Sequence, residues 1–314
     1  MKKTPIIIDT DPGIDDSIAI ITLAGSDNVE IKAITTTHGN VGLEGTTENA
    51  LKLCELLNLD CPVAKGANKP MIVPAKGASD VHGSNGLGGH VLPAPVKKPD
   101  EKAAWDVIYS IAKEEKGELV LVALGPLTNI ALALMKYPDL PKYVKRIYMM
   151  GGSRDYGNHS QYAEFNVWGD PHACHVVLES GIPITMSDLR FCAENKLKNA
   201  DFKALCEISP RLKPLLTSFY NHFKKFTLSQ GIADEENLEI ELCDPTIAGA
   251  LLSRDTSLVT NSYYVICETQ SSTNQGQTVF DYKGHLKRLP NVDLCISMDK
   301  NEYLANIRKA IAKF

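Results

Sequence analysis

The sequence predicts an α/β fold with a mostly parallel, Rossmann-like sheet flanked by helices. Short β-rich segments alternate with segments of helical periodicity, which is typical of βαβ units. Most of the β-rich segments are near-continuous apolar runs, as expected for parallel strands that are buried on both faces. The 314 residues contain no repeat, low-complexity tract or linker, so we expect a single domain spanning residues 1–314.

Each predicted strand and helix rests on its own local pattern. Strands are assigned to runs of apolar and β-branched residues, and helices to runs whose apolar residues recur every three to four positions. The predicted strands span residues 4–9, 29–37, 62–66, 118–125, 146–152, 183–189, 262–270, 277–282 and 292–299. The predicted helices span residues 15–25, 46–58, 103–115, 127–137, 171–181 and 302–314, and the pattern is also helical from about residue 199 to residue 252.

Composition and charge exclude several classes of function. The formal net charge is −5 and the isoelectric point is about 5.9, so we expect no nucleic-acid partner, because nucleic-acid-binding domains usually present a basic face. The apolar run after "MKKTP" is too short for a signal-peptide core or a membrane span, so we expect no membrane partner. The eight cysteines form no CxxC pair, which favours reduced thiols and a cytoplasmic location.

Four carboxylates lie where the first strand meets the first helix, in "DTDPGIDDS" at residues 9–17. Charges this close repel one another, so some other feature must offset the repulsion. Helix capping explains Asp15 and Asp16 at the start of the helix, but not Asp9 and Asp11. A hard cation such as Ca²⁺, which takes about six to eight oxygen ligands, explains the whole set. No nearby Cys/His cluster suggests zinc.

Further polar loops follow the predicted strands. "THGN", "ALGPLTN" and "MMGGS" each follow or end a strand, and ligands of such sheets bind beyond the carboxyl ends of the strands. We therefore expect these loops to converge with residues 9–16 on one crevice. A metal-dependent phosphohydrolase of the haloacid dehalogenase type is an alternative, since it also has two aspartates two positions apart after its first strand. Asp9 and Asp11 fit that pattern, but the continuation "PGIDD" does not.

The stretch "DTDPGIDDSIAI" resembles the N-terminal signature of the inosine–uridine-preferring nucleoside hydrolase family. The likeness covers nearly the whole chain, in shared order and spacing. Further matching motifs are "THGN", "VHGSNGLGG" from Val81, "ALGPLTNIAL", "MMGGS", "GN" at 157–158, "AEFNVWGDPHA" and "CDPTIA". The resemblance implies a Ca²⁺-dependent N-ribohydrolase of nucleoside salvage that splits a ribonucleoside into ribose and free base.

The resemblance also implies roles for individual carboxylates. The metal ligands of the family match Asp11, Asp16, Asp244 and the backbone carbonyl of Leu124. Asp11 would also act as a general base on the attacking water, which makes chemical sense for a carboxylate beside a metal ion. Asp9 would then orient its neighbours.

The chemistry of glycosidic cleavage explains why many polar side chains would surround the sugar. Breaking the bond builds positive charge on the ribose ring, and carboxylate and amide oxygens stabilise that charge. His82 matches a family histidine near the base or the 5′ side of the ribose, although a single loop histidine is often a surface residue. The family's ribose contacts match Asp15, Asn40, Met150, Asn158, Glu164 and Asn166.

Two positions depart from the family pattern. Many members have histidine where this chain has Cys243, and that histidine is implicated in protonating the departing base. Cys243 either lines the base pocket or only packs against the site wall, because a thiol is a weak hydrogen-bond donor. Arg190 stands where relatives commonly have aspartate. It either changes the charge around the site, contacts the substrate, or lies on the surface without a role.

A third uncertain region is "SFYNHFKKFTLSQG", from Ser218, which matches a helical part that lies near the base in relatives. Tyr220, His222 and Phe226 could stack on a base or supply a proton, or they could belong to the core. The alternative function is a protein of the same fold that binds ribose or a nucleoside without turnover. By resemblance we also expect a homo-oligomer, a dimer or a tetramer. The sequence leaves the choice between purine and pyrimidine bases open.

Overall fold

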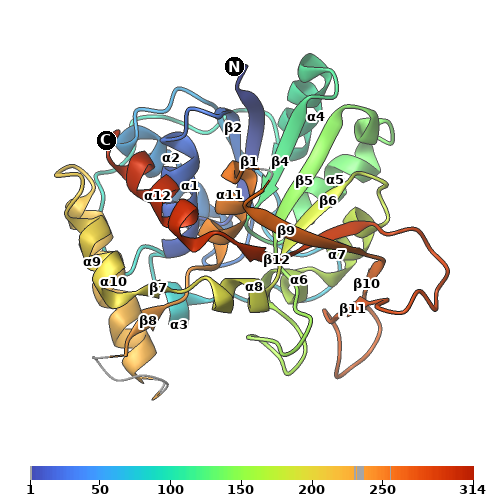
Figure 1. The fold of residues 1–314 in the computed structure, drawn as a ribbon. Helices are drawn as coiled ribbons and strands as arrows, with labels where there is room; N and C mark the ends of the chain where they lie inside the picture. Colours follow the sequence, from blue (N-terminus) through green and yellow to red (C-terminus); the bar gives the residue numbers. More distant parts are fainter. Residues whose placement is uncertain (1, 230, 232–236, 255) are drawn as a thin grey trace.

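A central sheet organises the structure, a computed structural model that describes residues 2–229, 231, 237–254 and 256–314 (Figure 1). Neighbouring strands from β3 to β12 are parallel, and β9 at one edge runs antiparallel to β12. In sheet order the strands are β3 (Val63–Lys65), β2 (Val29–Thr36), β1 (Thr4–Thr10), β4 (Leu119–Ala123), β5 (Val144–Met150), β6 (Ile184–Ser187), β12 (Val292–Met298) and β9 (Leu258–Tyr263).

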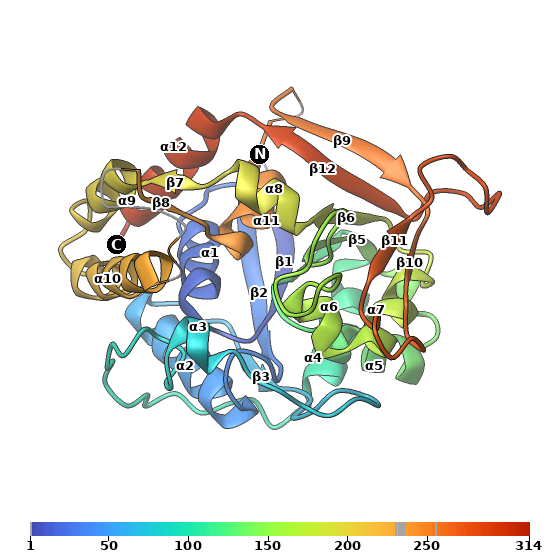
Figure 2. The ribbon, with the colours of Figure 1, turned by 90° about the horizontal axis from the view of Figure 1, so that it is seen from below.

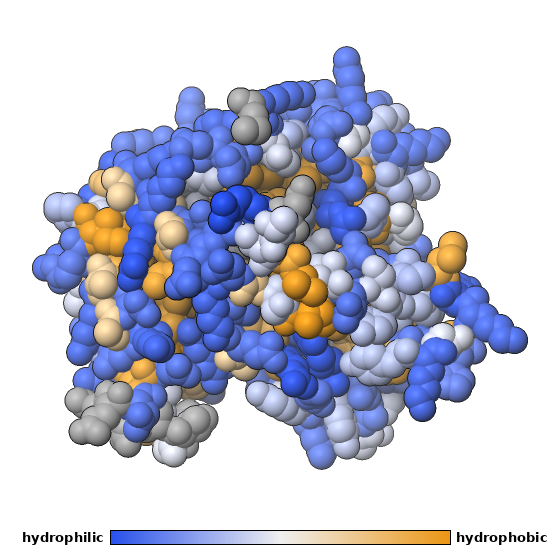
Figure 3. Space-filling view, viewed as in Figure 1, coloured by the Kyte–Doolittle hydropathy of each residue, from blue (hydrophilic) through white to orange (hydrophobic). Residues whose placement is uncertain are grey.

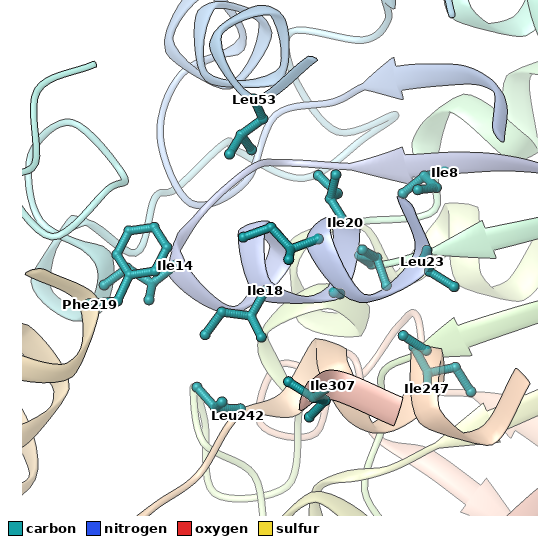
Figure 4. Packing of buried hydrophobic residues seen from close by; sticks show 14 of the residues in the cluster. Ile8, Ile14, Ile18, Ile20, Leu23, Leu53, Phe219, Leu242, Ile247 and Ile307 are labelled. Atoms are coloured by element: carbon teal, nitrogen blue, oxygen red, sulfur yellow. The ribbon is translucent and has the colours of Figure 1, made fainter. Parts of the chain in front are cut away.

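Helices cover both faces of the sheet because side chains alternate between the faces along each strand. In β1, Ile6 and Ile8 pack into one core and Ile7 into the other, and all three are fully buried. Figure 4 shows the first core around its central helix, with Ile247 and Ile307 from two other helices close by. Helices that contribute to this core include α1 (Ile14–Ala24), α2 (Leu43–Leu56), α11 (Cys243–Leu252) and α12 (Lys300–Ile311). Those of the second core are α4 (Ala104–Glu115), α5 (Thr128–Lys136) and α7 (Pro171–Leu178).

A helical extension packs beside the start of α1. It contains α9 (Asn199–Cys206) and α10 (Lys213–Ser229), which a two-stranded ribbon of β7 (Leu197–Lys198) and β8 (Glu239–Ile240) joins to the rest of the chain. Phe219 of α10 lies against Ile14 of α1 (Figure 4). The remaining short elements are α3 (Ser79–His82), η1 (Leu140–Lys142), α6 (Phe165–Gly169), α8 (Leu189–Glu194), β10 (Val265–Cys267) and β11 (Thr278–Phe280).

The predicted α/β class and the mostly parallel sheet are confirmed in one domain. The strand predicted at residues 262–270 is divided in the structure between the end of β9 and β10. The chain leaves the main sheet at Tyr263, and β10 pairs with β11 in a separate ribbon. Among the described residues, no helix combines the length and apolar character needed to cross a membrane.

The carboxyl ends of β1, β2, β4 and β5 meet at the lower edge of the sheet in Figure 1. Figure 2, seen from below, looks onto this edge and shows α3, α6, α8 and α10 arranged around it. In the space-filling view the lower outline is indented between the part that carries α10 and the part that carries α6 (Figure 3). The predicted polar loops all start from this edge.

Candidate active site

Asp9 lies at the centre of the strand ends and ties three segments together. In register it stands beside Thr35 of β2 and Ala123 of β4. Its Oδ1 accepts hydrogen bonds from Thr35 Oγ1 at 2.6 Å and from Asn129 Nδ2 at 2.8 Å. Burial raises the pKa of Asp9 to about 7. Asp9 therefore connects β1 to β2 and to the start of α5 through side-chain hydrogen bonds.

Asp11 is buried just beyond the end of β1, enclosed by two loops. Its Oδ2 accepts a hydrogen bond from Asn40 N at 2.7 Å, whereas its Oδ1 has no hydrogen-bond partner among the described residues. A Cβ atom at Gly39 or at Gly125 would collide with this carboxylate, so glycine at both positions lets the loops close around it. Burial, with the charges of Asp16 and Asp15, raises the pKa of Asp11 well above its ordinary value.

Asp16 accepts hydrogen bonds from three partners and also faces the other carboxylates. Its Oδ1 accepts a hydrogen bond from Thr10 Oγ1 at 2.5 Å, and its Oδ2 accepts from Gly13 N at 2.9 Å and from Asn40 Nδ2 at 3.0 Å. The bond to Gly13 N caps the first turn of α1. Capping thus accounts for part of the role of Asp16, but burial and the charge of Asp15 still raise its pKa.

Three carboxylates converge closely enough to share a cation. Oxygen atoms of Asp15, Asp16 and Asp244 all lie within 4.8 Å of one another, and all three residues are buried. Burial and the charges of Asp15, Asp16 and Asp11 raise the pKa of Asp244 well above its ordinary value. An all-oxygen donor set that is crowded and buried fits a hard divalent cation. The charge of Asp11 also acts on Asp244, and its Oδ1 has no hydrogen-bond partner in the described part of the chain.

A second group of polar atoms forms where β4, β5 and α6 meet. Glu164 caps α6: Oε1 accepts from Asn166 N at 2.8 Å, and Oε2 accepts from Gly152 N at 3.0 Å and Val167 N at 3.1 Å. Burial raises the pKa of Glu164 to about 7. Asn166 Nδ2 donates to the backbone carbonyls of Leu124 at 2.7 Å and Met150 at 3.3 Å.

The other residues matched to ribose contacts fall into different surroundings. Asn40 lies beneath the carboxylates, where Nδ2 also donates to the backbone carbonyl of Asp11 at 3.1 Å. His82 is buried, accepts a hydrogen bond from Ile14 N at 3.3 Å and places Nδ1 3.7 Å from Asp15 Oδ1. Asn158 lies in an exposed loop, where its Oδ1 accepts a hydrogen bond from Phe165 N at 2.9 Å.

The two positions that depart from the family pattern differ in their surroundings. Cys243 is the first residue of α11, half-buried, and its Sγ lies 4.0 Å from Glu241 Oε1. The neighbouring Cys192 thiol and burial raise the pKa of Cys243 well above its ordinary value. Arg190 is exposed on α8 and forms surface ion pairs with Glu194 at 3.1 Å and Asp155 at 3.2 Å.

The aromatic segment of α10 is mainly structural. Tyr220 is buried, donates a hydrogen bond to Asn199 Oδ1 at 2.6 Å and packs on Phe202. His222 Nε2 lies 2.8 Å from the carbonyl of Val81, the residue before His82, so it fixes α10 to the loop that carries His82. Phe226 is half-buried, and Gln230, near the end of the segment, lies outside the described residues.

Sequence reasoning passed over three side chains that hold the site together: Thr10, Thr35 and Asn129. Each fixes a carboxylate of the first strand region, as described above. The available signal was their position, since Thr10 and Thr35 lie near the ends of strands and Asn129 lies in the first turn of the helix that follows β4. Their partners cannot be identified from such positions alone, because hydroxyl and amide groups have many alternative uses in turns.

Comparisons with known proteins agree over the length of the chain. The family model described as inosine-uridine preferring nucleoside hydrolase matches residues 6–305. A non-specific ribonucleoside hydrolase, RihC, of Klebsiella pneumoniae is 35% identical over 95% of this chain and 94% of its own. A pyrimidine-specific ribonucleoside hydrolase, RihA, of an Enterobacter species is 34% identical over 99% of this chain and 98% of the RihA chain. The structure of a purine-preferring ribonucleoside hydrolase from Gardnerella vaginalis superposes with a TM-score of 0.87 at 26% identity, covering 98% of both chains. With the buried carboxylates in place, this agreement shows that the chain belongs to the inosine-uridine preferring nucleoside hydrolase family.

Proposed function

We propose that this enzyme hydrolyses the N-glycosidic bond of ribonucleosides to give ribose and free base, with Ca²⁺ as its metal ion and nucleoside salvage as its role. The observation that carries the proposal is the buried group of oxygens from Asp15, Asp16 and Asp244, together with the Oδ1 atom of Asp11, which has no hydrogen-bond partner among the described residues. Burying this much negative charge is costly unless a cation compensates it. The relatives reported above, all ribonucleoside hydrolases by name, support the same reaction.

Asp11, Asp16, Asp244 and the carbonyl of Leu124 would hold the cation. Bound there, a divalent cation would supply positive charge that favours hydroxide over water at the reacting position. The Leu124 carbonyl accepts a hydrogen bond from Asn166, which ties the metal side of the site to the sugar side. Asp15 stands between the two sides, since it belongs to the carboxylate group and approaches His82.

Side chains of this protein would carry out proton transfer, ribose binding and stabilisation of the developing charge. Asp11 would take a proton from the attacking water through Oδ1, which accepts no other hydrogen bond among the described residues. Glu164, Asn166 and Asp15 would hold the ribose hydroxyls and stabilise the positive charge that grows on the ring as the base departs. Asn40 and Asp9 would keep these groups in position through the hydrogen bonds described above.

A direct test is incubation with inosine, uridine, cytidine and adenosine, with ribose release as the measured product. We expect release from at least one nucleoside in the presence of Ca²⁺, and loss of release after chelation with EDTA. Binding of ribose or nucleosides without release from any of them would instead support the non-catalytic alternative. Full activity after exhaustive chelation would contradict the metal-dependent mechanism.

The bases that the enzyme accepts and its oligomeric state are two separate questions. The named relatives differ in base preference, being non-specific, pyrimidine-specific and purine-preferring, so likeness at this level does not fix the base. We further propose a cytoplasmic homo-oligomer, a dimer or a tetramer, in line with the family resemblance. Light scattering of the purified protein would give its mass directly, and a monomer at micromolar concentration would contradict this proposal.

A further inference from the structure

A half-buried ion pair lies at the end of the β7–β8 ribbon, close to the candidate active site. The antiparallel register pairs Leu197 with Ile240 and Lys198 with Glu239. The residues just beyond these pairs, Lys196 and Glu241, therefore stand side by side. Lys196 Nζ lies 3.0 Å from Glu241 Oε2, with about a third of each side chain exposed.

The second oxygen of Glu241 connects the ion pair to Cys243. Cys243 Sγ donates toward Glu241 Oε1 at 4.0 Å, and Asp244 of the carboxylate group follows Cys243 directly in α11. Cys243 thus lies between the carboxylate group and the ion pair, and the charges of both Glu241 and Asp15 act on its thiol. Figure 2 shows that the chain runs from β8 into α11 beside the ends of the parallel strands.

We propose that Lys196 and Glu241 bind the outer edge of the leaving base. In this arrangement the Lys196 ammonium donates to a ring carbonyl oxygen, and the Glu241 carboxylate accepts from the adjacent ring N–H. The ligand class is a base with a lactam edge, such as uracil or hypoxanthine. The inference rests on the proposed function and assigns it a base preference.

The fixed order of the two charges is what selects the base. Cytosine and adenine present an amino group where a lactam has its carbonyl, and an unprotonated ring nitrogen where a lactam has its N–H. With an amino group facing the ammonium and a lone pair facing the carboxylate, neither Lys196 nor Glu241 can form a hydrogen bond to the base. Sites that hydrogen-bond a polar edge discriminate strongly against ligands that lack it.

The pair also offers a way to activate the leaving group. When the C1′–N bond breaks, its electron pair stays on the base, and a new C1′–O bond forms from water, whose proton passes to Asp11. The negative charge of the departing base spreads onto its carbonyl oxygens, where an ammonium can stabilise it. Solvent then reprotonates the base. In this scheme Cys243 needs to donate no proton to the base, consistent with its S–H directed toward Glu241.

Kinetics on three substrates test the inference. Uridine and cytidine differ at the edge in question, and p-nitrophenyl riboside has neither a lactam nor an amino group. The variants are Lys196→Met, Lys196→Arg and the nearly isosteric Glu241→Gln. Lys145→Met is a matched control, because Lys145 forms an exposed ion pair with Glu118 at 2.9 Å on another part of the surface.

We expect the wild type to favour uridine over cytidine in kcat/KM. Lys196→Met and Glu241→Gln should lower kcat/KM for uridine by roughly ten- to a hundred-fold, as loss of a hydrogen bond to a charged group usually does. The uridine-to-cytidine ratio should fall toward one, while activity on p-nitrophenyl riboside stays near wild type. Lys196→Arg should keep most of the preference, and Lys145→Met should change nothing.

Two results would overturn the inference. One is an unchanged uridine-to-cytidine ratio in folded Lys196→Met and Glu241→Gln. The other is an equal loss of kcat/KM on all three substrates, which would show that the ion pair only stabilises the β7–β8 ribbon. Neither result resembles failure of the proposed function itself, in which the wild type would release ribose from no substrate.

Discussion

At the scale of a single residue, the surroundings of Asp11 support the proposed role of its carboxylate as a base. Its carboxylate is buried, one oxygen is fixed by Asn40 and the other accepts no hydrogen bond in the described part of the chain. Such an arrangement is costly for folding and useful for catalysis, because the free oxygen can take a proton or bind a cation. It follows that activity and stability should respond in opposite ways to neutralising this side chain.

Asp11→Asn tests that opposition. The amide keeps the shape but cannot take the proton, so turnover should fall by at least about 10²-fold. Without metal, the variant should unfold at the same temperature as the wild type or higher, because one of the mutually repelling carboxylates is gone. Ribose release and thermal unfolding in EDTA measure the two effects. Near-wild-type turnover would show that Asp11 is not the base.

Glu164 gives a pH-dependent prediction. Burial raises its pKa from 4.5 to about 7, so between these values the folded state holds a proton that the unfolded state has lost. Its contribution to the free energy of unfolding is therefore full below about pH 4.5 and is lost as the pH rises to 7. The full difference corresponds to about 3 kcal/mol.

Denaturant unfolding of the metal-free wild type and of Glu164→Gln at pH 5 and pH 8 measures this contribution. Between the two values the wild type should lose more stability than Glu164→Gln, because glutamine has no proton to release. Identical losses in the two proteins would contradict the raised pKa of Glu164.

Single residues also show where sequence reasoning stops. The order of the motifs was enough to match Asp11, Asp16, Glu164 and Asn166 to a family site. The partner of Asp9 was not predictable in the same way, since Asn129 follows it by 120 positions and meets it only through the sheet. Arg190 was left open for a similar reason, because its partner Asp155 comes from a loop that folds back onto α8.

At the scale of elements, the loop between β5 and α6 is held to α8 by an inner and an outer ion pair. In the inner pair, Arg154 binds both carboxylate oxygens of Asp188 at 2.7 Å and also donates to the backbone carbonyl of Cys295. Asp188 is fully buried and caps α8 through Phe191 N. The outer pair, between Asp155 and Arg190, is exposed.

The two pairs should therefore contribute unequally to stability. Arg154→Met leaves the Asp188 carboxylate buried without its partner, which should cost about 3–5 kcal/mol. Arg190→Met removes an exposed pair and should cost less than about 1 kcal/mol. Urea unfolding of both variants measures the difference in their free energies of unfolding. Equal losses would contradict a larger contribution from the buried Arg154–Asp188 pair.

The longer helices and strands were predictable because their pattern of apolar residues continues over many positions, as in α1, α2 and the parallel strands. The short helices α3, α6 and α8 have only four to six residues each and show no period. Two of them nevertheless carry candidate site residues, His82 in α3 and Asn166 in α6. Their positions depend on tertiary contacts such as the Glu164 cap and the Val81–His222 bond.

At the scale of the whole molecule, the sheet gathers negative charge at one edge. Asp11, Asp15, Asp16 and Asp244 come from the loop after β1 and from α1 and α11, and they meet because all three segments start or end at that edge. Burial and their mutual repulsion raise the pKa of Asp11, Asp16 and Asp244. Below these raised pKa values the carboxylates hold protons, and a cation must displace them to bind.

Calcium should therefore stabilise the whole fold, and more so at high pH. A ligand that binds only the folded state at a hundred times its Kd adds about 2.7 kcal/mol. At pH 8 we expect Ca²⁺ to raise the Tm of EDTA-treated protein clearly, and at pH 5 by much less, because protons then compete for the same oxygens. Asp244→Asn, which removes one charged ligand, should reduce the increase at pH 8, whereas Lys145→Met should leave it intact. An increase of the same size at both pH values, or one that survives Asp244→Asn in full, would place calcium binding elsewhere in the molecule.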